Sequence, residues 1–400
     1  MKRFGWILVL LLAASPAWAA KKITVQQLKD LLISLQQEKK TDADVAVQLR
    51  QVELTEELTL ATMNSLVNYV PGPYSTEQIY VLEARSALLA PPAVDLPATP
   101  APDAATQKAI LDKAVDYTTK TYAQLPHLTA TKTTIRFQDS MEVVKASSGM
   151  HSSASYGDDP ALAMANQYIR YINSTETPVE SANGVEKVST AKDKTPWGQN
   201  GQIVLLGQGP VLSTVLQEAQ AAGTINWLRW ELVNGREAAV YSFTVDKKKS
   251  HYAINYCCFP NWEQTGRMSF SGASGSSGPG ASAPSNMGDY SAKGNMQTNA
   301  TFNPYKATVP YHGEIFVDPN TGIVVRLITI ADFKATDVVH QEDQRIDYGP
   351  VTVGGKALEL PIKTIVNTEI VPNGDTGGGK YITRHTLFTA EYKDYQPAAH

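Results

Sequence analysis

The sequence predicts an α+β protein: a small helical bundle followed by a highly curved antiparallel sheet, a half-barrel covered by a few helices. Three observations lead to this fold class. Apolar residues recur at helical spacing up to about residue 90. A proline-rich stretch, residues 91–102, then interrupts the pattern. From residue 128 onwards, segments rich in β-branched and aromatic residues alternate with turn sequences, as in a sheet of short antiparallel strands.

Residues 1–19 have the three parts of a secretory signal peptide. Lys2 and Arg3 are positive, residues 4–14 are apolar, and Ala17-Trp18-Ala19 forms a cleavage site. The alternative, a membrane anchor, is disfavoured because the apolar run is too short to span a bilayer. No later segment reaches the ~18 apolar residues of a transmembrane helix. We therefore expect an exported, periplasmic or extracellular protein that is soluble after signal cleavage.

Residues 20–90 are expected to form the helical domain. Thr24–Gln27 has the pattern of a capping box, in which the Thr and Gln side chains satisfy early backbone N–H groups. A second helix is expected near Asp42, a third from about Thr55, and a fourth from a second capping box at Ser75–Gln78. Four short helices would form a bundle with a modest core.

Residues 91–102 are expected to be a semi-rigid proline-rich linker, and residues 103–400 the helix-plus-sheet domain. This domain would begin with a helix capped by Asp103, and Val211–Ala222 is a second amphipathic helix. Asn-Gly, Asp-Pro and Gly-Gly sequences mark the turns between strands. A low-complexity stretch at about 263–296 is expected to be a mobile Gly/Ser-rich loop between two strands.

Charge and composition exclude some classes of function. The chain has a net charge of −4, and removal of Lys2 and Arg3 with the signal makes it −6. This mild acidity gives no footprint for nucleic acid. The two cysteines, Cys257 and Cys258, are adjacent; they are reduced residues at a strand end, a redox-labile disulfide, or part of a soft-metal site.

The sequence shows no catalytic or metal-binding constellation. Its seven histidines are scattered, and none has the spacing of a metal-ligand pair. We therefore expect no cofactor, no metal and no enzymatic activity. A hydrolase would need residues from distant strands to converge; the candidates are His251, His312, His385 and Glu231.

Aromatic residues in the predicted strands are the best candidates for a binding site. Trp227 and Trp230 should lie on opposite faces of their strand, because side chains alternate along a strand. The aromatic side chains could line a cavity for an acyl chain or apolar peptide, or simply pack as an ordinary core. The candidate lining residues are Trp227, Trp230, Tyr241, Phe243, Tyr252 and Phe316.

Several of these segments also carry a resemblance. Ile225–Glu231, Tyr311–Pro319 and Asp347–Val351 resemble exported acidobacterial proteins similar to the half-barrel superfamily of the outer-membrane lipoprotein carrier LolA and of RseB. The resemblance implies a half-barrel that holds acyl chains or senses envelope components, and it implies no enzyme. The helical unit and the Gly/Ser-rich loop depart from a simple carrier.

Three functional hypotheses follow from the sequence. The first is a non-enzymatic envelope protein that binds an acyl chain, a lipoprotein or an apolar peptide in the concave face of the sheet. The second is an envelope interaction scaffold or sensor in which residues 21–90 dock a partner protein. The third, a hydrolase, has the weakest support.

Overall fold

The computed structural model describes residues 21–141, 167–187, 204–205, 210–260, 302–337, 339–370 and 384–398. The expected signal peptide and the Gly/Ser-rich loop lie outside these residues, as do the side chains of Cys257 and Cys258. The described part is an α+β structure with six α-helices and a ten-stranded antiparallel sheet that does not close on itself. None of its helices is long and apolar enough to cross a membrane.

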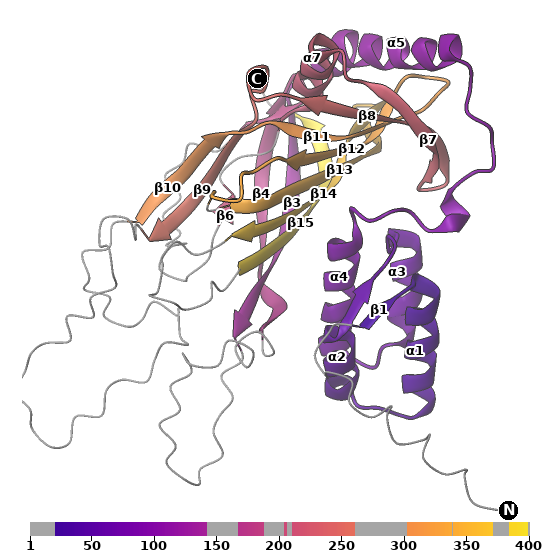
Figure 1. Ribbon diagram of the computed structural model, residues 1–400, viewed down its shortest axis with the longest axis vertical. Coiled ribbons are helices and arrows are strands. Elements are labelled where there is room, and N and C mark those ends of the chain that lie inside the picture. Colours follow the sequence, from indigo (N-terminus) through magenta and orange to yellow (C-terminus); the bar gives the residue numbers. More distant parts are fainter. Residues whose placement is uncertain are drawn as a thin grey trace, which may run out of the picture.

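Residues 21–90, which we call the helical unit, contain four helices around their own apolar core (Figure 1). In chain order its elements are β1 (Lys21–Ile23), α1 (Val25–Gln37), α2 (Asp42–Arg50), β2 (Val52–Leu54), α3 (Leu60–Leu66), η1 (Val67–Tyr69) and α4 (Pro73–Ser86). The predicted capping box at Thr24–Gln27 is confirmed, with both of its hydrogen bonds present.

The helical unit differs from the prediction in two respects. β1 and β2 form a parallel two-stranded sheet, which short apolar runs did not distinguish from helix. The predicted capping box at Ser75–Gln78 is wrong, because α4 already begins at Pro73. Asp42 at the start of α2 accepts hydrogen bonds from the backbone N–H groups of Tyr74 and Ser75 instead, at 3.0 and 2.9 Å. A neighbouring helix thus caps α4.

The large sheet brings together strands from the whole second part of the chain. In spatial order they are β5 (Val185–Glu186), β4 (Gln167–Ala182), β3 (Leu128–Met141), β15 (Arg384–Pro397), β14 (Lys356–Ile370), β13 (Val339–Val353), β12 (Val324–Ala331), β11 (Tyr311–Val317), β8 (Arg236–Val245) and β7 (Asn226–Val233). The predicted hairpin turns at Asn183-Gly184, Asn234-Gly235 and Gly354-Gly355 are confirmed, all with positive φ angles. β6 (Val204–Leu205), β9 (Ala253–Pro260) and β10 (Phe302–Thr308) form a separate small sheet.

One face of the large sheet, here called the α5/α7 face, is covered by α5 (Ala104–Lys120), η3 (Tyr122–Gln124) and α7 (Leu212–Ala222). Figure 1 shows α5 and α7 together, apart from the group α1–α4. The Asp103 side chain caps α5 as predicted, accepting a hydrogen bond from the Thr106 N–H at 2.7 Å. Glu218 anchors α7, since its carboxylate accepts hydrogen bonds from the Tyr311 hydroxyl and the His251 backbone N–H.

The opposite face, here called the α4 face, packs against the helical unit. Val81, Ala84 and Ala87 of α4 and the residues after it contact an apolar patch on the sheet. The patch consists of Phe137, Ile169, Ile365 and Leu387. The expected linker, residues 91–102, contains the short helix η2 (Ala93–Asp95) and contacts β7. Both faces of the sheet are therefore covered by helices.

Candidate functional site

Three of the six predicted lining residues lie in the core of the α5/α7 face. Tyr241, Phe243 and Tyr252 are each at most 2 % exposed. Their rings pack edge-on against neighbours, and the Tyr241 hydroxyl donates a hydrogen bond to the Gln107 backbone oxygen of α5 at 2.6 Å. These three side chains are therefore packed against neighbouring rings and, at Tyr241, against α5.

Trp227 and Trp230 lie on the same face, contrary to the prediction. Their ring centroids are 4.8 Å apart at 75° to each other, and both rings pack on the edge of the α5/α7 core. The cause is a β-bulge: Trp227 pairs with Tyr241, whereas Arg229 pairs with the next residue, Val240. The extra residue reverses the alternation that the prediction assumed.

Phe316 lies on the α4 face and is therefore separated from the other five. It packs with Val240 and Val325, and the guanidinium carbons of Arg229 and Arg326 lie 5.8 and 5.4 Å from its ring centroid. The structure thus does not bring the six predicted lining residues into one wall.

The four hydrolase candidates do not meet in one cleft. Glu231 is buried beside Arg229, whereas His251 pairs with Glu218 at 2.6 Å next to the opposite face. His312 of β11 pairs with Asp332 at 2.9 Å. His385 of β15 is four strand positions from β11, which is about 19 Å at the usual strand spacing.

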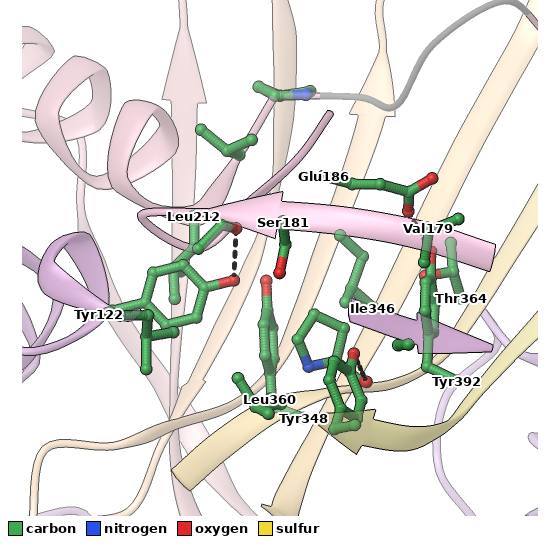
Figure 2. Close-up of a pocket in the computed structure, with 17 residues that line it drawn as sticks. Tyr122, Val179, Ser181, Glu186, Leu212, Ile346, Tyr348, Leu360, Thr364 and Tyr392 are labelled. Atoms are coloured by element: carbon green, nitrogen blue, oxygen red, sulfur yellow. Dashed lines mark hydrogen bonds between the residues drawn. The ribbon is translucent and has the colours of Figure 1, made fainter. Parts of the chain in front are cut away.

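A pocket of about 40 Å³ opens elsewhere on the α5/α7 face. Figure 2 shows its walls: Tyr122 of η3 and Leu212 of α7 on the helical side, with β3, β4, β13, β14 and β15 on the sheet side. The lining side chains are aliphatic or tyrosine for the most part, together with Ser181, Glu186 and Thr364.

The tyrosine hydroxyls around this pocket are hydrogen-bonded to the protein. Tyr122 donates to the Gly184 carbonyl oxygen at 3.0 Å, Tyr392 to Glu186 Oε2 at 3.0 Å, and Tyr395 to the Pro361 carbonyl oxygen at 2.7 Å. Tyr348 lies edge-on to Tyr122 and shares a hydrogen bond with it. The tyrosines therefore offer ring surface to the pocket, and their donors are already in use.

Burial keeps these phenols neutral. It raises the pKa of Tyr122, Tyr348 and Tyr392 far above the usual value, because the phenolate form would lose its hydration. The nearby Glu186 raises the pKa of Tyr392 further, and that carboxylate is itself paired with Lys132 at 2.9 Å. The pocket wall is consequently uncharged apart from this one compensated pair.

Gly184 forms the rim of the pocket at the tip of the β4–β5 hairpin. Its φ of +75° belongs to the left-handed region, and a Cβ there would lie 2.3 Å from the Tyr122 ring. Only glycine fits between the turn and this ring. The Asn183-Gly184 dipeptide predicted the turn, but no local pattern pointed to the tyrosines, because η3, β13 and β15 are far apart in the chain.

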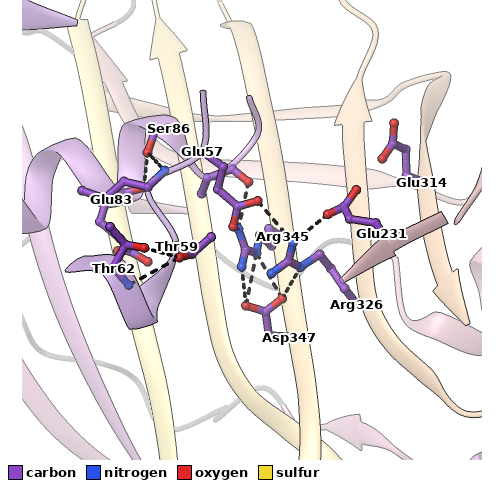
Figure 3. Close-up of polar contacts among 12 residues, drawn as sticks. Glu57, Thr59, Thr62, Glu83, Ser86, Glu231, Glu314, Arg326, Arg345 and Asp347 are labelled. Carbon is purple, nitrogen blue, oxygen red and sulfur yellow. Dashed lines mark hydrogen bonds and ion pairs between the residues drawn. The ribbon is translucent and has the colours of Figure 1, made fainter. Parts of the chain in front are cut away.

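A second candidate site, a cluster of charged side chains, lies between the helical unit and the α4 face of the sheet (Figure 3). Glu57, from the segment between β2 and α3, contacts Arg345 at 2.5 Å and Arg326 at 3.4 Å. Asp347 bridges the same two arginines at 2.8 and 2.7 Å. All four side chains are nearly inaccessible to solvent. Glu83 of α4 adds a further buried pair with Lys363 at 2.8 Å.

The two arginines keep Asp347 ionised. Burial alone would raise the pKa of Asp347, but the charges of Arg326 and Arg345 outweigh it and hold this pKa well below its usual range. Across the contact, the acids Glu57 and Glu83 come from the helical unit and the bases from the sheet. The cluster is saturated with ion pairs, so its geometry favours docking of the helical unit over ligand binding.

Comparison with protein-family models, with curated proteins and with solved structures finds no match for this chain.

Proposed function

We propose that the protein is a non-enzymatic, exported envelope protein that binds an apolar chain, such as the acyl chain of a lipid or lipoprotein, or an apolar peptide. The binding site would be the α5/α7 face of the sheet, entered at the tyrosine-lined pocket. The proposal takes this face, which α5, η3 and α7 cover, as the concave face of the expected half-barrel.

The observation that supports this proposal is the chemistry of the pocket wall. Ring faces and aliphatic side chains surround the space, and the tyrosine hydroxyls are bound to protein acceptors. An apolar guest loses little by entering this pocket, whereas a polar guest would give up its hydration for few new hydrogen-bond partners. The site therefore favours a hydrocarbon chain or apolar side chains.

The pocket must enlarge to accept such a guest. A volume of about 40 Å³ holds only a few water-sized groups, whereas sites for drug-sized ligands have ~300–1,000 Å³. The part of the wall formed by η3 and the start of α7 is the natural moving part, because it rests on the sheet without being a strand of it.

A fluorescent acyl probe tests this proposal. We expect saturable binding to the full chain and at least tenfold weaker binding to Ala130→Leu, because the larger side chain fills the pocket from β3. Thr131→Leu is the control, since it introduces the same leucine side chain one residue further along β3, on the opposite face. Ser181→Leu fills the pocket from β4 and serves as the second variant if Ala130→Leu does not fold.

Equal probe binding by the wild-type chain, Ala130→Leu and Ser181→Leu would contradict the proposed site. Absence of saturable binding by a folded wild-type chain would contradict the proposed function.

The scaffold hypothesis, in which residues 21–90 dock a partner protein, is limited to the surface of this unit that does not contact the sheet. α4 and Glu57 of the helical unit are occupied by contacts with the sheet. A partner protein would have to dock on a part of residues 21–90 that these contacts leave accessible; Val47 and Tyr74 are exposed there. Loss of co-purification after Tyr74→Ser and Val47→Ser would support this second candidate.

A further inference from the structure

The edge strand β7 presents an aromatic surface formed by Trp227 and Trp230. The bulge places both indoles on one side of the strand, edge-on to each other. The Trp227 ring packs edge-on against the buried Tyr241 ring, with 5.6 Å between the ring centroids. Both indoles are partly buried against the α5/α7 core, and part of each stays exposed. Among the described residues β7 pairs only with β8, so the outer edge of the strand is not covered by another strand. We call this surface the tryptophan ledge.

A proline-rich stretch of the same chain lies against the ledge. The Trp230 Nε1–H donates a hydrogen bond to the Pro100 carbonyl oxygen at 3.0 Å, and Thr99 approaches Glu237 of β8 at 3.5 Å. Residues 91–102 contain five prolines: Pro91, Pro92, Pro97, Pro100 and Pro102. Pro92, which precedes the short helix η2, has polyproline II angles, with φ −61° and ψ 150°, and the residues at the ledge, Thr99 and Pro100, follow η2.

This combination of groups is suited to recognising a polyproline II segment. Such a segment makes no internal hydrogen bonds, so its carbonyl oxygens are free to accept bonds from a partner. An aromatic surface that also presents a hydrogen-bond donor can bind such a segment in two ways: its rings pack on the prolines, and its donor binds a carbonyl oxygen. The backbone is already extended, so little conformational entropy is lost on binding.

Few hydrogen bonds hold the segment in its present place: apart from those at Thr99 and Pro100, the Gln107 side-chain amide donates to the Pro102 carbonyl oxygen at 2.7 Å. Val94 is 80 % exposed and Leu96 is 41 % exposed, and the Trp230–Pro100 hydrogen bond is itself exposed. A neutral hydrogen bond of this kind contributes about 0.5–1.5 kcal/mol. The contact therefore depends on the covalent connection, which keeps the segment at a high local concentration near the ledge.

We propose that the tryptophan ledge is a docking site for a proline-rich segment of a partner protein, and that residues 91–102 occupy it in cis until such a partner replaces them. The proposal does not rest on acyl binding, because the ledge lies on β7 whereas the pocket is walled by β3, β4, β13, β14 and β15. A second copy of the chain could donate the same segment, and an assay at low protein concentration separates that case.

The test uses the full chain with Pro97, Pro100 and Pro102 replaced by serine, which keeps the length of the segment. The probe is a labelled synthetic peptide with the sequence of residues 91–102. We expect the peptide to bind this variant at least tenfold more tightly than the wild-type chain, where the cis segment competes. Binding should shift the Trp230 indole N–H resonance.

Two controls make the result specific. Trp230→Phe, placed in the proline-to-serine variant, keeps a ring but loses the donor, so peptide binding should weaken about fivefold for the loss of ~1 kcal/mol. A peptide with alanine in place of proline should bind at least tenfold more weakly. Tyr80→Phe on α4 is the matched neutral substitution and should change nothing.

Absence of peptide binding by the folded proline-to-serine variant would overturn the proposal, as would equal affinity for the alanine peptide. If that variant does not fold, Trp230→Phe in the wild-type chain is the test. Without the hydrogen bond from Trp230, residues 91–102 should leave the ledge more often, and proteolysis within them should accelerate severalfold. An unchanged rate would overturn the proposal.

Discussion

Glu57 is the position at which a single change should loosen the helical unit from the sheet most strongly. The substitution Glu57→Gln keeps the size of the side chain and one acceptor oxygen but removes the charge between Arg326 and Arg345. Glu57 is 3 % exposed and Arg345 is 5 % exposed, so water cannot replace the lost carboxylate. Arg345, which now pairs with two acids, would then keep only Asp347.

The expected magnitude follows from the contacts that remain. Removing one partner of a buried ion pair costs about 3–5 kcal/mol. Arg345 retains Asp347, and Arg326 retains Asp347 and Glu231, so we expect the lower end of this range, about 3 kcal/mol. The hydrogen bond from Arg345 to the Ala87 carbonyl oxygen should be weakened with the pair.

Urea unfolding at pH 7 measures the loss, and hydrogen exchange in residues 81–90 locates it at the contact between α4 and the sheet. Glu38→Gln is the matched control, because Glu38 is 55 % exposed and pairs with Lys40 at 3.4 Å. Removal of such a surface pair should change stability by less than about 0.5 kcal/mol. Equal stability of the Glu57→Gln and Glu38→Gln variants would refute the account of this cluster.

Three further predictions concern protonation and the pocket rim. Burial raises the pKa of Asp343 to about 6, so the protonated side chain contributes stability below pH ~4, and this contribution is lost as the pH rises through 6. Asp343→Asn should therefore be more stable than the wild-type chain at pH 8, by about 1–3 kcal/mol in urea unfolding. A variant that is no more stable than the wild-type chain at pH 8 would contradict this prediction. The depressed pKa of Asp347 acts in the opposite direction, because the ionised carboxylate stabilises the folded state above pH ~4 and this stabilisation is lost on acidification. The free energy of unfolding should therefore fall less steeply between pH 4 and pH 2 in Asp347→Asn than in the wild-type chain. Parallel curves of unfolding free energy against pH would contradict this prediction. Gly184→Ala should destabilise by about 1–2 kcal/mol, because its Cβ would meet the Tyr122 ring at a positive φ; thermal unfolding checks this against Gly355→Ala, which has a similar φ but open space around it.

Local features of the fold could be predicted from the sequence. The Thr24 and Asp103 caps, the Asn-Gly and Gly-Gly turns and the helix at residues 212–222 depend on residues within a few positions of one another. Their geometry is decided by backbone hydrogen bonds and allowed φ angles, which the local sequence specifies directly. These predictions are confirmed.

Features that depend on register or on distant contacts could not be predicted. The bulge between Trp227 and Arg229 cannot be recognised from the order of polar and apolar residues in β7, yet it moves Trp230 to the other face of the sheet. The contact between Glu57 and Arg345 joins residues 288 positions apart. Buried charges are rare, so composition alone gave no reason to place three acids and two arginines under the helical unit.

The pocket was missed for the same reason. Tyr122, Tyr348 and Tyr392 belong to three separate elements, and only the strand order β3–β15–β14–β13 brings them together. The aromatic residues that are close together in the chain, around Trp227 and Tyr241, were predicted to line a site, but they form core and surface and do not line one cavity.

Native mass spectrometry of the full chain, exported from a bacterial host and analysed with solvent extraction of bound material, tests the proposed function most directly. We predict that a fraction of the wild-type protein carries the extra mass of an acylated or otherwise apolar species, and that Ala130→Leu carries much less of it. A folded wild-type protein that shows only its own mass, with or without added lipid, would contradict the proposal.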